Sequence, residues 1–289
     1  MTDSGEELRR RVAETYASWL TNPQRRGCCD QPIVAMQATG YDVAEIGDLP
    51  GDAVINAFGC GSPVDFSDIA PGDVVADLGC GAGLDLLLAA AKVEPTGRVI
   101  GVDMTDAMIQ RAWGNIAAAG AGNVEVRKGI IEDLPLAEAS IDWVISNCVL
   151  NLSPDKPRAF AEIARVLKPG GRMRVADIIA EDLPEWVQNS RLLYDSCIGG
   201  AISEDAYATG LRNAGLTDVT IGNRHVYDRD TLCGFAAATT NDPTESHRVA
   251  DALVGRIWSA YISAIKPTPI PRSEARNDQS HNQRKGRRR

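Results

Sequence analysis

Histidine and long apolar runs are scarce in this sequence of 289 residues. The three histidines, His225, His247 and His281, lie outside the positions expected to line a ligand site, so we do not expect a histidine-based metal centre. No apolar stretch reaches the roughly 20 residues that span a bilayer. No charged segment followed by an apolar one marks a leader at the N-terminus. We therefore expect a cytoplasmic protein with no membrane partner.

Basic residues are also fewer than acidic ones: the sequence has 30 basic and 39 acidic side chains, which gives a net charge of −9. Basic residues gather in 272–289, which leaves the rest of the chain still more acidic. An acidic body disfavours nucleic acid as the main partner. We expect residues 268–289 to be a disordered basic tail.

Alternating strand and helix patterns begin at residue 71 and predict an α/β fold. Residues 257–265 fit a strand or a helix, and we expect a final strand there. Together these patterns predict a doubly wound, mostly parallel seven-stranded sheet, and we expect its ligand site at the carboxyl ends of the strands. The other expected strands are 74–79, 98–103, 124–128, 141–147, 172–179 and 219–227, and the main expected helices are 84–93, 105–119, 154–167 and 204–214.

Further segments flank or interrupt this fold. Residues 1–70 are expected to form an N-terminal extension that carries thiols, begins with an amphipathic helix over 6–21 and packs over the mouth of the main domain. The main domain is expected to cover 71–267, with a substrate-binding insertion at about 180–203.

A buried strand that runs into a glycine loop organises the main domain. Gly79, Gly81 and Gly83 let the backbone approach a ligand where a Cβ would collide, and the following helix directs its free N–H groups at that ligand. A dinucleotide-binding loop would need its third glycine at Leu84. The pattern D-x-G-x-G-x-G, which starts at Asp77, instead resembles the first motif of the class I S-adenosylmethionine methyltransferases.

Acidic and apolar side chains follow the next strands at the same edge of the sheet. Asp103 ends the second strand, where a carboxylate can accept hydrogen bonds from both ribose hydroxyls, and Met104 can pack on the adenine. The resemblance implies that Ile131 stacks on the adenine while Glu132 accepts from its exocyclic amine. Asn147, at the end of the fourth strand, completes the expected cofactor contacts. Each acid alone fits a solvated loop residue, but together they predict an S-adenosylmethionine site.

Most methyltransferases need a base near the methyl donor, but in this sequence cysteines occupy the positions expected near the cofactor. Cys60 precedes the first strand, Cys148 follows the fourth strand, and Cys197 lies in the insertion. A free cysteine is more often a small buried hydrophobe than a functional group, and we assign Cys80 and Cys233 to that role. In a cytoplasmic protein the seven cysteines are expected to be mostly reduced thiols.

The motifs around these cysteines resemble the arsenite methyltransferase family. They are Gly-Cys-Gly-Ser-Pro at 59–63, Ser-Asn-Cys-Val-Leu-Asn-Leu-Ser-Pro-Asp-Lys at 146–156 and Cys-Ile-Gly-Gly-Ala at 197–201. Gly-Val-Asp-Met-Thr at 101–105 and Val-Leu-Lys-Pro-Gly-Gly at 166–171 fit the same resemblance. It covers about residues 10–267.

This resemblance implies an enzyme that methylates arsenite with S-adenosylmethionine, in arsenic detoxification. It implies that Cys60, Cys148 and Cys197 are the arsenic(III) ligands, and that Cys28 or Cys29 supplies an accessory cysteine. Glutathione or thioredoxin is the implied reductant, and we expect a monomer.

The chemistry of arsenic agrees with this resemblance. Trivalent arsenic is thiophilic, and soft thiolates select soft centres. Three thiolates can displace the hydroxides of arsenite and leave the arsenic lone pair facing the methyl donor. No base is then required, because the nucleophile carries no proton. Positioning alone can lower such a barrier by roughly 7–11 kcal/mol.

Two other functions remain compatible with the sequence. One is a class I methyltransferase that acts on carbon or oxygen of a small organic acceptor, in which the cysteines are incidental. The other is a thiol protein that sequesters or senses arsenic without catalysis. The acids after the second and third strands argue against the second alternative, because such a protein has no use for a nucleoside pocket.

Overall fold

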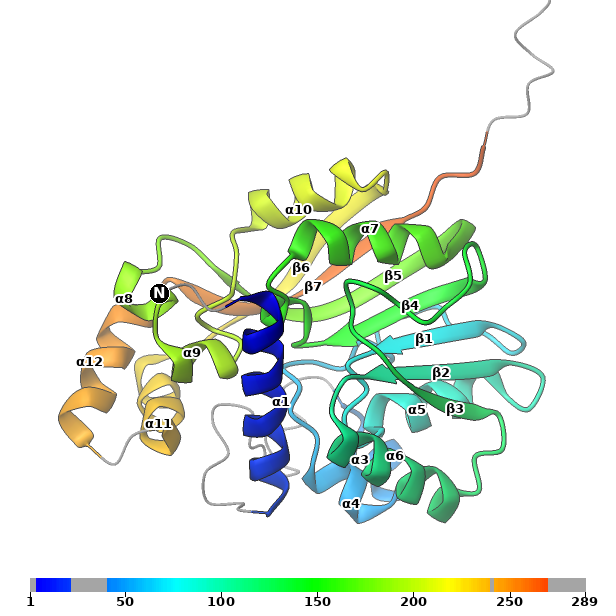
Figure 1. Ribbon diagram of the computed structural model, residues 1–289, viewed down its shortest axis with the longest axis horizontal. Coiled ribbons are helices and arrows are strands. Elements are labelled where there is room, and N and C mark those ends of the chain that lie inside the picture. Colours follow the sequence, from blue (N-terminus) through cyan, green and yellow to red (C-terminus); the bar gives the residue numbers. More distant parts are fainter. Residues whose placement is uncertain (1–3, 22–40, 240–241, 270–289) are drawn as a thin grey trace, which may run out of the picture.

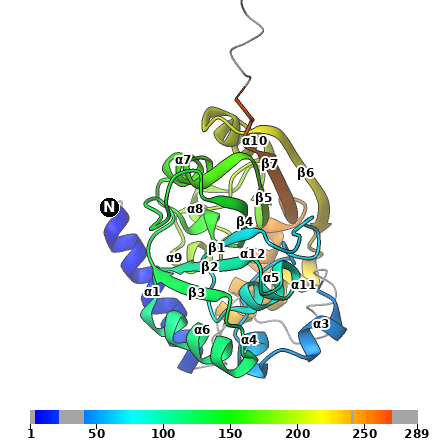
Figure 2. The ribbon, with the colours of Figure 1, turned by 90° about the vertical axis from the view of Figure 1, so that its right-hand side faces the viewer.

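The computed structural model describes residues 4–21, 41–239 and 242–269 of the chain. Its centre is a seven-stranded sheet with the order β3-β2-β1-β4-β5-β7-β6 (Figures 1 and 2). The first five strands are parallel, whereas β7 runs antiparallel to both β5 and β6. The strands are β1 (Val74–Leu78), β2 (Arg98–Asp103), β3 (Val124–Lys128), β4 (Ile141–Asn147), β5 (Leu167–Ala180), β6 (Thr217–Val226) and β7 (Ile257–Ile265).

Helices cover both faces of this sheet, which confirms the doubly wound α/β fold. On one face α7 and α10 pack on the strands through Phe160, Tyr207 and Leu211. On the other face α5 and α6 contribute apolar side chains to a second core. The helices described are α1 (Gly5–Thr21), α3 (Val43–Gly47), α4 (Gly51–Ile55), α5 (Leu84–Val93), α6 (Asp106–Ala119), η2 (Leu150–Leu152), α7 (Lys156–Val166), α8 (Glu185–Gln188), α9 (Arg191–Asp195), α10 (Glu204–Asn213), α11 (Arg229–Thr239) and α12 (Pro243–Leu253).

Residues 257–265 form a strand, as predicted. Their pattern also fitted a helix because β7 is buried over almost its whole length, and a strand covered on both faces loses the alternation that identifies strands. Pairing with β5 on one side and β6 on the other decides the conformation.

The expected boundaries around β5 need correction. Helix α7 begins at Lys156 instead of residue 154, because Asp155 caps it by accepting a hydrogen bond from the Arg158 N–H. The Lys-Pro-Gly-Gly segment at 168–171 belongs to β5 instead of a loop. A register shift between Ile141 and Trp143 of β4 accommodates these extra residues.

None of the described helices is both long and apolar enough to cross a membrane. A third cluster of buried side chains includes the carboxyl-terminal part of β5 and brings together Cys60, Cys148 and Cys197 with apolar residues of α8, α9, α11 and α12. Cys28, Cys29 and most of the basic tail lie outside the described residues.

Candidate active site

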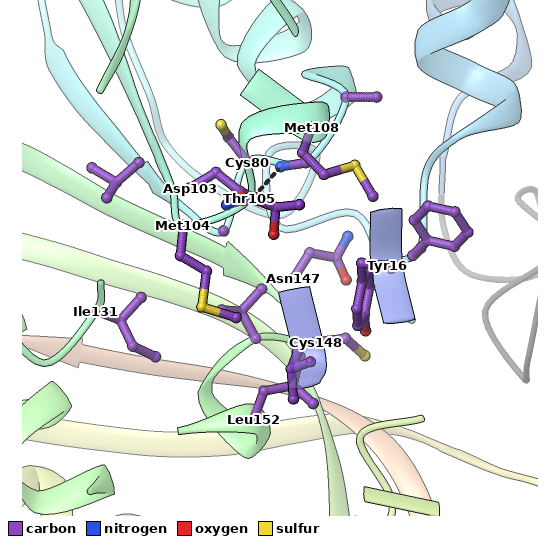
Figure 3. A pocket seen from close by; sticks show the side chains of 18 of the residues that line it. Tyr16, Cys80, Asp103, Met104, Thr105, Met108, Ile131, Asn147, Cys148 and Leu152 are labelled. Carbon is purple, nitrogen blue, oxygen red and sulfur yellow. Dashed lines mark hydrogen bonds between the residues drawn. The ribbon is translucent and has the colours of Figure 1, made fainter. Parts of the chain in front are cut away.

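A cavity with about 970 Å³ of empty space opens at the carboxyl ends of the parallel strands. The glycine loop and the residues after β2, β3 and β4 line it, and the N-terminal helix α1 closes one side. Figure 3 shows Asp103 and Thr105 at one end of this cavity, with Cys148 and Tyr16 towards the other. The predicted cofactor residues Met104 and Ile131 also line it, as expected from their positions after β2 and β3.

The glycine loop has the backbone that its sequence predicted. Gly79 and Gly83 have φ angles of 71° and 94°, a region that favours glycine. A Cβ on Gly79 would lie 2.3 Å from the Val149 side chain. Gly83 caps α5 without any side-chain hydrogen bond, so the helix directs uncapped N–H groups at the cavity.

Asp103 both shapes the loop and faces the cavity. Its carboxylate accepts hydrogen bonds from the backbone N–H groups of Gly81, at 3.0 Å, and Thr105, at 2.8 Å. Burial raises the pKa of Asp103, and these two hydrogen bonds partly offset the rise. The loop and the end of β2 are thereby held together at the edge of the cavity.

Two more buried carboxylates lie near Asp103. Burial, with the charges of Asp85 and Asp103, raises the pKa of Asp77 well above its usual range, and Asp77 Oδ2 has no hydrogen-bond partner among the described residues. Asp85, which the sequence analysis missed, lines the cavity from the first turn of α5. Burial raises its pKa to about 7, against the hydrogen bonds from Asn147 and Tyr41. The one feature of the sequence that could have indicated Asp85 is its position as an acidic residue directly after the glycine loop.

These acids fit S-adenosylmethionine. That molecule carries a sulfonium and an ammonium group, and clustered buried carboxylates are costly unless a cation lies beside them. Asp85, which lines the cavity, and the uncapped start of α5 provide for an ammonium and a carboxylate, respectively. The site therefore fits a cationic amino acid attached to a nucleoside.

Glu132 lines the cavity, but its contacts differ from the predicted one. Its Oε1 accepts a hydrogen bond from Ser153 Oγ at 2.6 Å and lies 3.6 Å from Arg9 Nη1. The carboxylate therefore already joins the turn after β4 to α1. Its predicted contact with an exocyclic amine stays a prediction.

The three predicted cysteines converge from distant parts of the chain. Cys60 and Cys148 form a disulfide across a Cα–Cα distance of 6.1 Å, an exception to the expectation of mostly reduced thiols, whereas Cys80, Cys197 and Cys233 are free. This Cα separation lies within the range that a disulfide bridges. The Cys197 thiol donates a hydrogen bond to the Cys148 carbonyl at 2.7 Å. In this bridged form the described residues hold no group of three His, Cys, Asp or Glu side chains suited to a metal ion, so a three-sulfur site requires reduction.

Backbone geometry marks two of these cysteines as unusual. Cys148 has a φ of 58° and Cys197 a φ of 64°, both in the left-handed region that residues with a Cβ seldom adopt. Such conformations persist only where the surroundings enforce them, and they concentrate at functional sites. Of the other cysteines, Cys80 is buried against Gly101 as predicted, and the partly buried Cys233 lies 3.4 Å from His247 Nδ1.

Asn147 holds the Cys60 loop, a role that differs from the cofactor contact predicted for it. Its Oδ1 accepts a hydrogen bond from the Cys60 N–H at 2.8 Å, while its Nδ2 donates to Tyr41 Oη at 2.9 Å and to Asp85 at 3.1 Å. On the far side of the loop, Tyr261 Oη accepts from the Ser62 N–H at 2.8 Å. Asn147 also lines the cavity, so it joins the cofactor end to the sulfur end.

Residues 69–215 match the protein family described as "Methyltransferase domain". The chain is 41% identical over 231 residues to an arsenite methyltransferase of Halobacterium salinarum, covering 75% of this chain and 59% of that protein. It is 36% identical over 257 residues to the arsenite methyltransferase of Mus musculus, covering 81% and 66%. The chain thus spans about three fifths to two thirds of the length of these curated relatives.

The fold is similar to the crystal structure of an arsenic(III) S-adenosylmethionine methyltransferase from Chlamydomonas reinhardtii. The TM-score is 0.58 and the identity 29%, over 83% of this chain and 75% of that one. With the glycine loop, the buried acids and the sheet order already described, these similarities agree with the motifs of the sequence. The chain belongs to the class I S-adenosylmethionine-dependent methyltransferases and, within them, to the arsenite methyltransferase family.

Proposed function

We propose that this chain methylates trivalent arsenic held by Cys60, Cys148 and Cys197. The observation that carries the proposal is the convergence of these three sulfurs in one buried cluster, with Cys148 also lining the cofactor cavity. The same proposal assigns the donor site to a domain of residues 71–267. Residues 1–70 and the insertion at 180–203 supply two of the thiols.

Substrate capture begins with reduction of the Cys60–Cys148 disulfide. Two molecules of glutathione, or the dithiol of one thioredoxin, reduce this disulfide to two cysteine thiols and become one reductant disulfide. Three cysteine thiols then replace the three hydroxides of arsenite, forming three As–S bonds and releasing three waters. The nearness of Cys148 and Cys197 supports this step, since the Cys197 thiol lies 2.7 Å from the Cys148 carbonyl oxygen and both cysteines belong to one buried cluster.

S-adenosylmethionine supplies a methyl group on a sulfonium centre. The thiolates hold arsenic so that its lone pair forms the new As–C bond, while the C–S electron pair stays on the departing thioether sulfur. Arsenic thereby passes formally from the trivalent to the pentavalent state. Two electrons return arsenic to the trivalent state. The oxidation of two cysteine thiolates to one disulfide provides these two electrons, and Cys60 and Cys148 are close enough to form that disulfide. The external thiol reductant completes the cycle.

Single cysteine variants test this proposal. Arsenite, glutathione and labelled S-adenosylmethionine are incubated with the wild type and with Cys60→Ser, Cys148→Ser and Cys197→Ser. We expect loss of arsenite methylation in the Cys148 and Cys197 variants, with binding of the methyl donor retained. Cys233→Ser is the matched control, because Cys233 is a free thiol on α11 outside the three-cysteine site. Full arsenite methylation by Cys148→Ser contradicts the proposal and leaves a methyltransferase for an organic acceptor.

A further inference from the structure

The N-terminal helix α1 contacts both the cofactor cavity and the thiol loop. Arg9, Val12 and Tyr16 line the cavity, and Arg9 lies 3.6 Å from the buried Glu132. In Figure 1 the helix runs across the carboxyl ends of the parallel strands. The residues that line the cavity lie at these same ends. Val12, Trp19 and Leu20 are buried, so a continuous apolar face anchors the helix in this position.

The same helix contacts the loop that carries Cys197. Thr15 Oγ1 donates a hydrogen bond to Asp195 Oδ2 at 2.9 Å, and Arg11 Nη2 lies 3.5 Å from Asp195 Oδ1. Asp195 is buried and ends α9, two residues before Cys197. The hydroxyl of Tyr16 lies 3.8 Å from Cys197 Sγ. One turn of α1 therefore reaches both the sulfur and the carboxylate that precedes it.

Aromatic contacts extend this arrangement to the Cys60 loop. The ring of Tyr16 packs against Trp19, with centroids 4.7 Å apart, and against Phe58, with centroids 5.7 Å apart. Phe58 precedes Cys60 by two residues and lines the cavity. The three rings thus close the space beside the sulfurs on the side of α1.

The Cys197 loop needs such outside support. The four-residue helix α8 and the five-residue helix α9 precede it, and helices of that length are not stable by themselves. The left-handed backbone at Cys197 adds a local cost that the surroundings must offset. Thr15, Arg11 and Tyr16 are the contacts through which α1 provides that support.

We propose that Thr15 and Tyr16 are positioning residues for the arsenic site: Thr15 fixes Asp195 at the base of the Cys197 loop, and Tyr16 orients the Cys197 sulfur. This inference rests on the proposed function, since it assumes that Cys197 binds arsenic. It assigns the N-terminal helix to the substrate site as well as to the cover of the cofactor cavity.

Calorimetric titration of the full chain tests this inference. The protein is reduced with a phosphine and titrated separately with arsenite and with S-adenosylhomocysteine. For Thr15→Val and Tyr16→Phe we expect the Kd for arsenite to rise about tenfold, the effect of one lost hydrogen bond to a charged or reactive group. The Kd for S-adenosylhomocysteine should stay within about twofold of the wild type, because Thr15 is not among the residues that line the cavity and Tyr16→Phe keeps the ring that lines it. Glu14→Gln is the matched control, since Glu14 is exposed on the same helix and pairs with Arg10.

The two titrations separate positioning from general loosening of the helix. If α1 merely detached in the variants, the affinity for S-adenosylhomocysteine would fall together with that for arsenite, and the inference would be wrong. Wild-type arsenite affinity in both variants would also overturn it. Cys197→Ser provides the separate check on the proposed function: unchanged arsenite binding in that variant would refute the three-cysteine site itself.

Discussion

Asp85 occupies the first turn of α5 but is only 8% exposed, and its carboxylate accepts hydrogen bonds from Tyr41 Oη, at 3.1 Å, and from Asn147 Nδ2. Acids in the first turn of a helix are usually solvated and interact favourably with the helix dipole. Here burial dominates and raises the pKa to about 7. At neutral pH a carboxyl in this state is only partly charged, and a cation beside it increases the charged fraction.

Binding of the methyl donor should therefore depend on pH through Asp85. Because its pKa is raised, the carboxyl of the ligand-free protein is largely protonated below about pH 7, and a cationic ligand must displace that proton. We expect the affinity for S-adenosylmethionine to increase between about pH 6 and pH 8, with release of a proton on binding. Calorimetry in buffers of different ionisation enthalpy measures both quantities.

Asp85→Asn separates this effect from other titrations. The amide keeps the shape and one acceptor but no charge, so the affinity should be lower and nearly independent of pH over the same range. Asp65→Asn is the control, because Asp65 contributes to the charge near Asp85 without lining the cavity. A pH dependence that persists in Asp85→Asn would refute this assignment.

Helix α7 illustrates how one motif serves two purposes. Within the Ser-Asn-Cys-Val-Leu-Asn-Leu-Ser-Pro-Asp-Lys segment, Cys148 is a proposed arsenic ligand, whereas Asp155 accepts a hydrogen bond from the Arg158 N–H at 3.1 Å and caps the helix. Lys156, the first residue of the helix, donates to the backbone carbonyls of Asn151 and Ser153. The end of the motif therefore fixes the turn that follows the cysteine.

Loss of the cap should lower stability and leave the site intact. Asp155→Ala removes one acceptor from the start of α7, and such caps contribute about 1 kcal/mol. We expect the free energy of unfolding in urea to fall by about that amount, with the affinity for arsenite unchanged. Ser203→Ala, which removes the equivalent cap of α10, should behave alike. An arsenite affinity that fell with Asp155→Ala would instead make the cap part of the substrate site.

At the scale of the whole molecule, the Cys60–Cys148 disulfide joins the segment before the sheet to the end of β4. The two cysteines are 88 residues apart in sequence, so the bridge closes a long loop. Loops of this length restrict the unfolded chain strongly, and native disulfides contribute about 2 to 4 kcal/mol to stability. The proposed catalytic form is therefore the less stable of the two redox forms.

Reduction should lower the stability of the whole fold. We expect the free energy of unfolding in urea to fall by about 2 to 4 kcal/mol when a phosphine is added to the wild type. Cys148→Ser should be insensitive to the phosphine, whereas Cys233→Ser should respond like the wild type. Equal unfolding midpoints for the oxidised and reduced wild type would contradict the prediction.

Local patterns in the sequence determined most of the sheet and the donor site. The strand that enters the glycine loop, the helix at 84–93 and the strand at 98–103 appear as predicted, because each depends on residues only a few positions apart. The position of Asp103 at the cavity was predicted from its place at the end of β2. The strand at 257–265 was ambiguous, since its conformation depends on two distant pairing partners.

What the sequence determined by itself is the order of strands and helices along the chain and the glycine loop, since both depend on residues a few positions apart. The choice of Cys60, Cys148 and Cys197 came from motifs that resemble a known family, and their shared role is a proposal. Only the tertiary structure decided that Cys60 bonds to Cys148, that Asn147 holds the Cys60 loop, and that α1 reaches Asp195. These contacts join residues 87 to 180 positions apart. No local periodicity records such pairs; they form because packing of the sheet and its helices brings the segments together.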